Sequence, residues 1–315
     1  MIDPHVHLRD WNQAEKETVL HGLAVAAACG FTHVFDMPNT DPPLTSRETV
    51  LRRLELAAPA EAATGVAYHV WLGLTADPEQ IAEMVALYGE LRPRAVGMKL
   101  FLGHSTGNMG ICEYAEQLAV MRTLTELDYR GTVAVHAEKE SLMRPELYVP
   151  GRFETHSEAR PPEAEIESVR DILAIAEETG FAGTLHVAHV STRGALELVR
   201  AARAAGRRVT CGVTPHHALY TSADAAEHDR FLKMNPPLRG EEDRRAVFTA
   251  LLDGTADWME SDHAPHTREQ KENGASGIPG LENMPRLIAA LKAAGITEER
   301  LREITYGNAA EQFGI

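Results

Sequence analysis

The first ten residues, MIDPHVHLRD, place two histidines one residue apart, at His5 and His7. On a β-strand, residues i and i+2 project from the same face, so both imidazoles would enter one space. Neutral imidazole nitrogens are ligands for zinc and related divalent ions, as are carboxylate oxygens. The start of the chain is therefore a candidate metal site that needs further ligands from elsewhere.

Further candidate ligands stand where predicted strands end. They are Lys99 in VGMKLF, His136 in TVAVHAE, His189 in HVAHVS and Asp262 in ESDHAPH. In a parallel α/β barrel the carboxyl ends of all strands meet at one rim, where the active site lies. Together with His5 and His7, these residues predict a metal site at that rim.

Lys99 is the unusual member of this group. An ammonium group has three donors and no lone pair, and its charge would repel metal ions. A neutral amine can react with carbon dioxide to give a carbamate, an anion whose two oxygens can bridge two metal ions. We therefore expect Lys99 to be carboxylated.

Other histidines have simpler interpretations. A single histidine in a strand is more often packed or hydrogen-bonded in the core than a metal ligand. We interpret His33, His69 and His186 in this way, and we expect His156 to face solvent.

Strand-like and helix-like segments alternate eight times along the chain. Helices are predicted at 16–29, 46–58, 78–91, 113–127, 162–179, 192–205 and 241–252, with further helices after residue 262. This alternation favours parallel strands, and the number of units favours an α/β fold, a closed (β/α)8 TIM barrel. The runner-up, an open doubly wound sheet, would need a Gly-rich phosphate loop after an early strand, which HLRDWNQ does not provide.

Composition limits the possible partners and locations. The 315 residues contain no Pro/Gly/Ser-rich linker, so residues 1–315 are predicted to form one catalytic barrel domain. A net charge of −15 argues against nucleic acid and anionic lipid as partners. The sequence has no long apolar run, no signal-peptide pattern and no paired cysteines, so we expect a cytoplasmic protein without disulfides.

A set of motifs gives the chain a family resemblance. In order, they are DPHVHLRD, DMPNT, GMKLF, VHAE, HVST, TPHH, KMNPPLR, SDHAPHT and GIPGLE. With these motifs the chain resembles dihydroorotases of the amidohydrolase superfamily from Asp3 to about Phe313. The resemblance implies a zinc-dependent hydrolase of pyrimidine biosynthesis that interconverts L-dihydroorotate and N-carbamoyl-L-aspartate.

The resemblance also implies a role for each matched position. His5, His7 and Asp262 would bind one zinc ion, His136 and His189 the second, and carboxylated Lys99 would bridge them. Asp262 is also the candidate acid-base group of catalysis. The implied substrate contacts are Arg9 and Asn39 for a carboxylate, Asn235 and His266 for the ring or carboxylate, and the backbone of Pro279 and Gly280. The loop LGHSTGN would be a lid, with Ser105 or Thr106 as donors to the substrate.

The chain departs from the family pattern in three places. The β-sandwich of many relatives is not expected here, because the first metal ligand is at residue 5 and the chain stops at EQFGI. RDWNQ stands where many members have R-[DE]-P-G, which leaves the shape of the first loop open. Gly212 stands where relatives often have Glu, so an acid that supports the metals is expected to be missing.

Alternative functions remain open at this point. Hydantoinase (dihydropyrimidinase) and allantoinase share the barrel and metal chemistry but do not need Arg9, Asn39 and His266 for a ring carboxylate. A non-catalytic dihydroorotase-like scaffold is a third alternative. Inactive relatives typically lose metal ligands, whereas all six ligand positions are occupied here. A homodimer, or association with aspartate transcarbamoylase, is a possible assembly.

Overall fold

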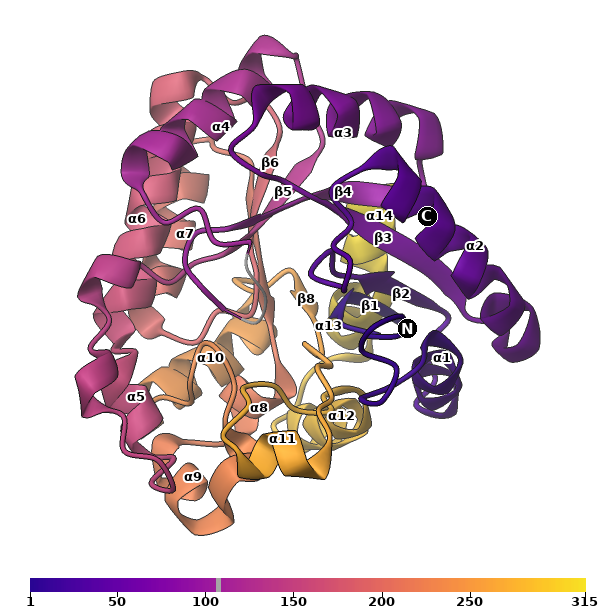
Figure 1. The fold of residues 1–315 in the computed structure, drawn as a ribbon. Coiled ribbons are helices and arrows are strands. Elements are labelled where there is room, and N and C mark those ends of the chain that lie inside the picture. The colour runs from indigo at the N-terminus through magenta and orange to yellow at the C-terminus, as the bar shows by residue number, and fades with distance from the viewer. Residues whose placement is uncertain (106–108) are drawn as a thin grey trace.

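The computed structural model describes residues 1–105 and 109–315, without the side chains of 226–230. Eight parallel strands form one sheet in chain order (Figure 1). They are β1 (Ile2–Val6), β2 (His33–Asp36), β3 (Ala67–Gly73), β4 (Ala95–Phe101), β5 (Thr132–His136), β6 (Thr184–Val187), β7 (Val209–Val213) and β8 (Trp258–Met259). A parallel bridge between Val6 and His263 joins the two edges. The predicted (β/α)8 barrel is confirmed.

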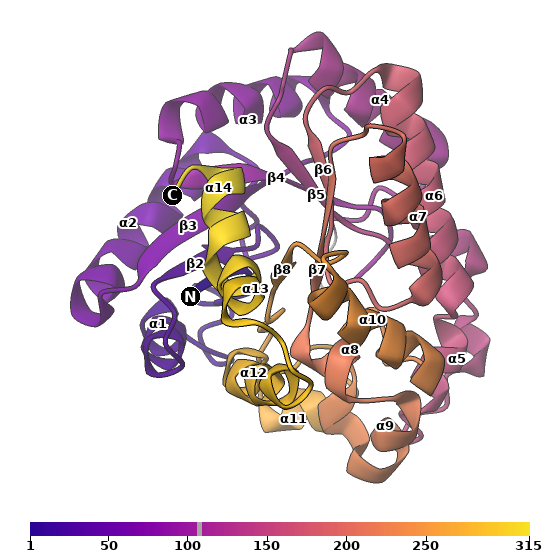
Figure 2. The same cartoon turned by 180° about the vertical axis from the view of Figure 1, so that it is seen from behind.

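Long helices follow the strands and surround the barrel (Figures 1 and 2). They are α1 (Val19–Ala28), α2 (Arg47–Thr64), α3 (Pro78–Leu91), α4 (Tyr114–Glu126), α6 (Pro162–Thr179), α7 (Arg193–Ala204), α10 (Glu241–Asp253) and α12 (Met284–Ala293). Both α3 and α6 begin and end at the predicted residues. No helix among the described residues is long and apolar enough to cross a membrane.

The second helix is longer than predicted. It begins after Ser46, whose side chain accepts from the backbone N–H of Thr49 in a capping box. It continues past Pro59 and ends at Gly65, whose φ of 72° forms a left-handed cap. The prediction ended this helix at residue 58, whereas the helix continues through Pro59 to Thr64.

Short helices lie in the long connections between strands and helices and after β8. Between β5 and α6 lie η1 (Glu140–Leu142), η2 (Pro145–Leu147) and α5 (Thr155–Ala159). The predicted loop after β7 contains α8 (Pro215–Leu219), α9 (Ser222–His228) and η3 (Asp229–Leu232). After β8 come α11 (Arg268–Glu272), η4 (Leu281–Asn283), α13 (Glu298–Arg302), the π-helix η5 (Glu303–Gly307) and α14 (Asn308–Phe313).

Strand alternation divides the core into two layers. In β3, Val70 and Leu72 pack with the surrounding helices, whereas Trp71 belongs to a cluster inside the barrel. Phe313 of α14 packs against this interior cluster, with its ring centroid 5.5 Å from that of Trp71 and 5.6 Å from that of Trp258. Figure 2 shows α14 in front of the strands. One end of the barrel is thus filled by apolar side chains, which leaves the other end for polar chemistry.

Candidate metal centre

The first predicted ligand group converges from β1 and the segment after β8. Nε2 of His7 lies 3.0 Å from Oδ1 of Asp262, and Nε2 of His5 lies 3.4 Å from the same oxygen. The structure thus brings together residues 5, 7 and 262, whose donor atoms lie within 4.8 Å of one another. Burial would raise the pKa of Asp262, but the neighbouring side chains of His7, His216 and Lys99 lower it overall.

Hydrogen-bond chemistry shows why a cation fits this group. Nδ1 of His7 lies 2.7 Å from Oδ1 of Asn39, an oxygen that can only accept, so this ring nitrogen is the donor. Nε2 of the same ring then presents a lone pair to the carboxylate of Asp262. Two acceptors facing each other repel unless a proton or a cation lies between them.

The second predicted ligand group consists of His136, the last residue of β5, and His189, two residues after β6. Nε2 of His136 donates to Oε2 of Glu138 at 3.0 Å, which leaves a lone pair on Nδ1 of His136. That atom faces Nε2 of His189 at 3.1 Å. A tetrahedral zinc ion holds two nitrogen ligands about 3.3 Å apart, so this pair is spaced as ligands are. Burial lowers the pKa of both histidines, which keeps them in the neutral form that binds metals.

Lys99 lies between these groups in the lining of the same cavity. Its side chain is fully buried, and its Nζ has no hydrogen-bond partner in the described part of the chain. Burial lowers the pKa of Lys99 to about 8, so a minority of its amine, far more than for an exposed lysine, is neutral near physiological pH. A neutral, unpartnered amine is the form that carboxylation requires.

Glu260 supplies the supporting acid that the sequence analysis expected to be missing at Gly212. It follows β8, is fully buried, and accepts hydrogen bonds from the backbone N–H of His189 and from Nε1 of Trp258, the latter at 3.1 Å. A Cβ built on Gly212 would overlap the Glu260 carboxyl group. The acid is therefore present, but it is provided by the residue that follows β8 and not by β7.

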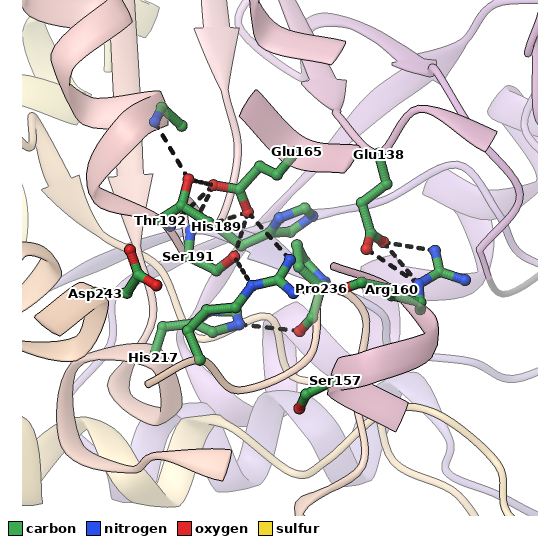
Figure 3. Close-up of polar contacts among 12 residues, drawn as sticks. Glu138, Ser157, Arg160, Glu165, His189, Ser191, Thr192, His217, Pro236 and Asp243 are labelled. Carbon is green, nitrogen blue, oxygen red and sulfur yellow. Dashed lines mark hydrogen bonds and ion pairs between the residues drawn. The ribbon is translucent and has the colours of Figure 1, made fainter. Parts of the chain in front are cut away.

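Two more carboxylates that the sequence analysis missed hold the ligand-bearing segments in place (Figure 3). Glu138 is fully buried and pairs with Arg160, whose Nε lies 3.0 Å from Oε1, and this pairing and the hydrogen bond from His136 outweigh burial and lower the pKa of Glu138. Glu165 of α6 accepts from the backbone N–H and the hydroxyl of Thr192, three residues after His189. The signal in the sequence was weak, since a single Glu near a strand end is typical of many exposed positions.

The side chains of both predicted ligand groups line a single cavity at the mouth of the barrel. Arg9 and Asn39 line it beside the metal ligands. The Arg9 side chain is 1% exposed, its Nε donates to the carbonyl of Pro265 at 3.2 Å, and burial lowers its pKa to about 10. Its Nη1 has no hydrogen-bond partner among the described residues. A buried guanidinium with an unused donor is suited to an anionic ligand.

The first loop takes its shape from left-handed backbone at three consecutive residues. Arg9, Asp10 and Trp11 have φ values of 40°, 67° and 50°. The carboxylate of Asp10 accepts from the backbone N–H groups of Trp11 and Val19 at 2.8 and 2.9 Å, which ties the loop to the start of α1. RDWNQ thus forms a tight turn that directs the Arg9 side chain toward the cavity.

The remaining predicted substrate contacts divide into two groups. Asn235 and Ser105 line the cavity, whereas Thr106 lies outside the described residues. His266, Pro279 and Gly280 are not part of its lining; Nε2 of His266 lies 3.4 Å from Nη2 of Arg9, and Pro279 faces a separate surface pocket. Their roles as substrate contacts stay predictions.

One expectation about histidines was wrong. His156 does not face solvent: it is 7% exposed, and its Nε2 donates to Oδ1 of Asn235 at 2.8 Å. The segment of α5 folds back over the rim and buries this ring, and burial lowers the pKa of His156 to about 3. His156 therefore orients a residue of the cavity.

Comparison with known proteins places this site in a family. The chain is 37% identical over 322 residues to a dihydroorotase of Halobacterium salinarum, covering all of this chain and 71% of that protein. It is also 37% identical over 319 residues to a dihydroorotase of Thermococcus kodakarensis, covering 68% of that protein. A scan against protein-family models finds no match.

Solved structures agree on the fold. An L-hydantoinase from Arthrobacter aurescens superposes with a TM-score of 0.88 at 25% identity, covering 99% of this chain and 70% of that one. A dihydroorotase from Campylobacter jejuni superposes with a TM-score of 0.76 at 19% identity, covering all of this chain and 83% of that one.

The barrel and its rim of histidines, lysine and aspartate define a metal-dependent cyclic amidohydrolase. The 37% sequence identity to two dihydroorotases, which extends over the whole of this chain, identifies one family within that class. The chain belongs to the dihydroorotase family.

Proposed function

We propose that residues 1–315 act as one catalytic barrel domain that interconverts L-dihydroorotate and N-carbamoyl-L-aspartate. The cyclic substrate and the open product share a carboxylate, which in the ring lies on the carbon opposite the nitrogen whose amide bond forms or breaks. The site must therefore bind an anion within a chain whose net charge is −15. A local cation has to overcome this unfavourable overall field.

The observation that carries the proposal is the state of Arg9. Its guanidinium is buried and lines the cavity with Asn39, and among the described residues the carboxylates of Asp36, Asp262 and Glu17 act on it only from beyond ion-pair distance. Leaving a buried cation without an anion is costly, whereas a planar guanidinium can hold a substrate carboxylate through two parallel hydrogen bonds. The relatives from Halobacterium salinarum and Thermococcus kodakarensis are dihydroorotases, which agrees with such a substrate.

We assign two zinc ions to the facing donor atoms. His5, His7 and Asp262 would hold one, His136 and His189 the other, and the carboxylated amine of Lys99 would bridge them. When bound, such ions polarise a carbonyl and make water a stronger nucleophile near neutral pH. The fit rests on the donor set, which consists of neutral imidazoles, one carboxylate and a buried amine with no partner in the described chain.

Asp262 is the group placed to move the proton. In ring opening, its carboxylate accepts a proton from the attacking water and then delivers it to the ring nitrogen as the amide bond breaks. The lowered pKa of Asp262 keeps it ionised and ready to act as a base. In ring closure the same group works in the reverse order.

A second candidate function is favoured by the structural comparison. The hydantoinase superposition has the higher TM-score of the two comparisons above, 0.88 against 0.76. Hydantoin, however, carries no carboxylate to pair with Arg9. Hydantoinase activity is therefore the alternative outcome of the same experiment.

The experiment compares dihydroorotate, hydantoin and allantoin as substrates of the protein prepared with zinc and bicarbonate. We expect kcat/KM to favour dihydroorotate by about 10- to 100-fold, the size of one charge-assisted contact. Metal analysis should give two zinc ions per chain, and native mass spectrometry should show one bound carbon dioxide that is lost in Lys99→Arg. Faster turnover of hydantoin would establish the alternative, and absence of both metal and turnover would establish a non-catalytic scaffold.

The assembly is a separate proposal. Association with a second copy of the chain or with aspartate transcarbamoylase stays a prediction, and size-exclusion chromatography with light scattering tests the first. A small-molecule substrate needs neither partner to reach the cavity.

A further inference from the structure

A second cluster of metal-binding side chains lies on the rim between β4 and β5. Nδ1 of His104 lies 3.0 Å from Oε2 of Glu140, and Sγ of Cys112 lies 3.2 Å from that nitrogen and 3.4 Å from that oxygen. His104 and Cys112 are on the segment after β4, and Glu140 is in η1. None of the three is a ligand of the barrel centre.

The three atoms are spaced as the corners of one face of a tetrahedron. Around a zinc ion, nitrogen, oxygen and sulfur ligands lie about 3–4 Å from one another. In the metal-free protein, three donors instead converge on the same oxygen of Glu140: the thiol, the His104 ring and the backbone N–H of His104 at 2.8 Å. One cation would replace the two side-chain protons that now separate these groups.

The local charge also favours a cation. Burial and the hydrogen bond and charge of Glu140 raise the pKa of the Cys112 thiol to about 11. The same negative potential that opposes a thiolate attracts a positive ion. His104 and Glu140 are about half exposed, so an ion can reach the cluster from solvent and keep a water molecule as its fourth ligand.

We propose that His104, Cys112 and Glu140 form a separate binding site for one divalent transition metal ion of the zinc class. Binding releases the proton of the Cys112 thiol to solvent and moves the Nδ1 proton of His104 to Nε2 of the same ring, so the cluster becomes thiolate, neutral imidazole, carboxylate and metal ion. The sulfur ligand selects zinc, cobalt or similar ions over magnesium and calcium. The proposal does not depend on the reaction of the barrel centre.

The position of the cluster links it to the cavity. Nη2 of Arg160 donates to the carbonyl of His104 at 3.1 Å and also to Glu138, which holds His136. Ser105, which follows His104, lines the cavity. An ion in this site would fix Ser105 and the Arg160 network relative to η1.

Cobalt(II) distinguishes the two sites because only one contains sulfur. The predicted barrel centre has nitrogen and oxygen donors alone, so a thiolate-to-cobalt charge-transfer band in the near ultraviolet reports the new site whether or not the barrel centre is loaded. We expect metal-free protein to develop this band and to saturate it with one equivalent. Cys112→Ser should lose the band, and His104→Ala should need a higher cobalt concentration for any remaining band.

Cys29→Ser is the matched control, because it removes a half-buried thiol elsewhere in the fold and should leave the band unchanged. Circular dichroism should show that the Cys112→Ser barrel is folded. A band that persists in Cys112→Ser, or that needs many equivalents of cobalt in the unaltered protein, would overturn the proposal. Failure of the chain to turn over dihydroorotate would leave this test unaffected.

Discussion

Glu260 occupies the space above Gly212 that a side chain on β7 would fill. The Glu260 carboxylate accepts from the backbone N–H of His189 and lies 3.8 Å from Nδ1 of His5. A buried acid that contacts ligands of both predicted metals is thereby provided by the strand next to the one expected. Gly212 and Glu260 depend on each other, because the side chain of Glu260 fits only where β7 carries no side chain.

This mutual dependence predicts strong non-additivity. Glu260→Ala leaves the N–H of His189 unpaired, and we expect zinc affinity to fall about 10- to 100-fold, as for other residues that support metal ligands. Gly212→Glu alone places two carboxylates in one buried space and should lower the free energy of unfolding by about 3 kcal/mol or more. The double variant Gly212→Glu/Glu260→Ala should recover much of both losses.

Urea unfolding and zinc competition with a chelator measure these effects. Glu260→Gln serves as the matched control, since it keeps the size and an acceptor oxygen but removes the charge. Losses that simply add in the double variant would show that the two positions are independent.

Arg9 should control recognition of the substrate carboxylate. Arg9→Lys retains the charge but loses the planar pair of donors, and we expect KM for dihydroorotate to rise about tenfold or more while kcat changes less. Steady-state kinetics on hydantoin provide the comparison, because the substitution should change KM little for a substrate without the carboxylate. Equal losses on both substrates would contradict the assignment.

Asp262 should act on the rate of the chemical step. Removing a general base or acid typically lowers turnover about 10²- to 10⁴-fold, and we expect a loss in this range for Asp262→Asn. Metal analysis must accompany the kinetics, since the residue is also a predicted ligand. A variant that keeps both zinc ions and near-normal turnover would show that Asp262 is a ligand only.

His69 should make the barrel sensitive to acid. It is 4% exposed, its Nδ1 donates to the carbonyl of Pro93 at 2.8 Å, and burial lowers its pKa to about 4 from the ordinary histidine value of 6.5. Unfolding frees this ring to bind a proton, so its contribution to stability is complete above pH 6.5 and is lost as the pH falls toward 4. The shift corresponds to about 3 kcal/mol.

The measurement is urea unfolding of the metal-free protein between pH 7.5 and 4. His69→Asn retains a donor near the position of Nδ1 but does not titrate, so its free energy of unfolding should fall less over this range. Parallel pH curves for the two proteins would exclude His69 as the source of the acid sensitivity.

The sequence was sufficient to locate the barrel and the rim. Parallel strands bring their carboxyl ends together, so residues as distant as His5 and Asp262 could be placed in one site from strand periodicity alone. The bounds of α3 and α6 also followed from local signals, because proline begins each helix and Gly180 ends α6 in the left-handed region.

The supporting residues could not be predicted in this way. Glu260 matters because of the space that Gly212 leaves on another strand, and that relationship depends on the register of β7 against β8. His156 looked exposed because its helix lies in a long connection, and only the fold of that connection buries it. Contacts between segments without a regular period leave no pattern in a single sequence.

Three residues at the mouth of the barrel hold unfavourable backbone conformations: Arg9, His189 and Asp262 have φ values of 40°, 39° and 45°. Each such conformation costs about 1–3 kcal/mol for a residue other than glycine. Glycine would relieve the strain at all three positions, but it would remove the guanidinium, the imidazole and the carboxylate. Selection for heat resistance and selection for turnover therefore oppose each other at these positions, and gains in thermal tolerance have to come from elsewhere in the molecule.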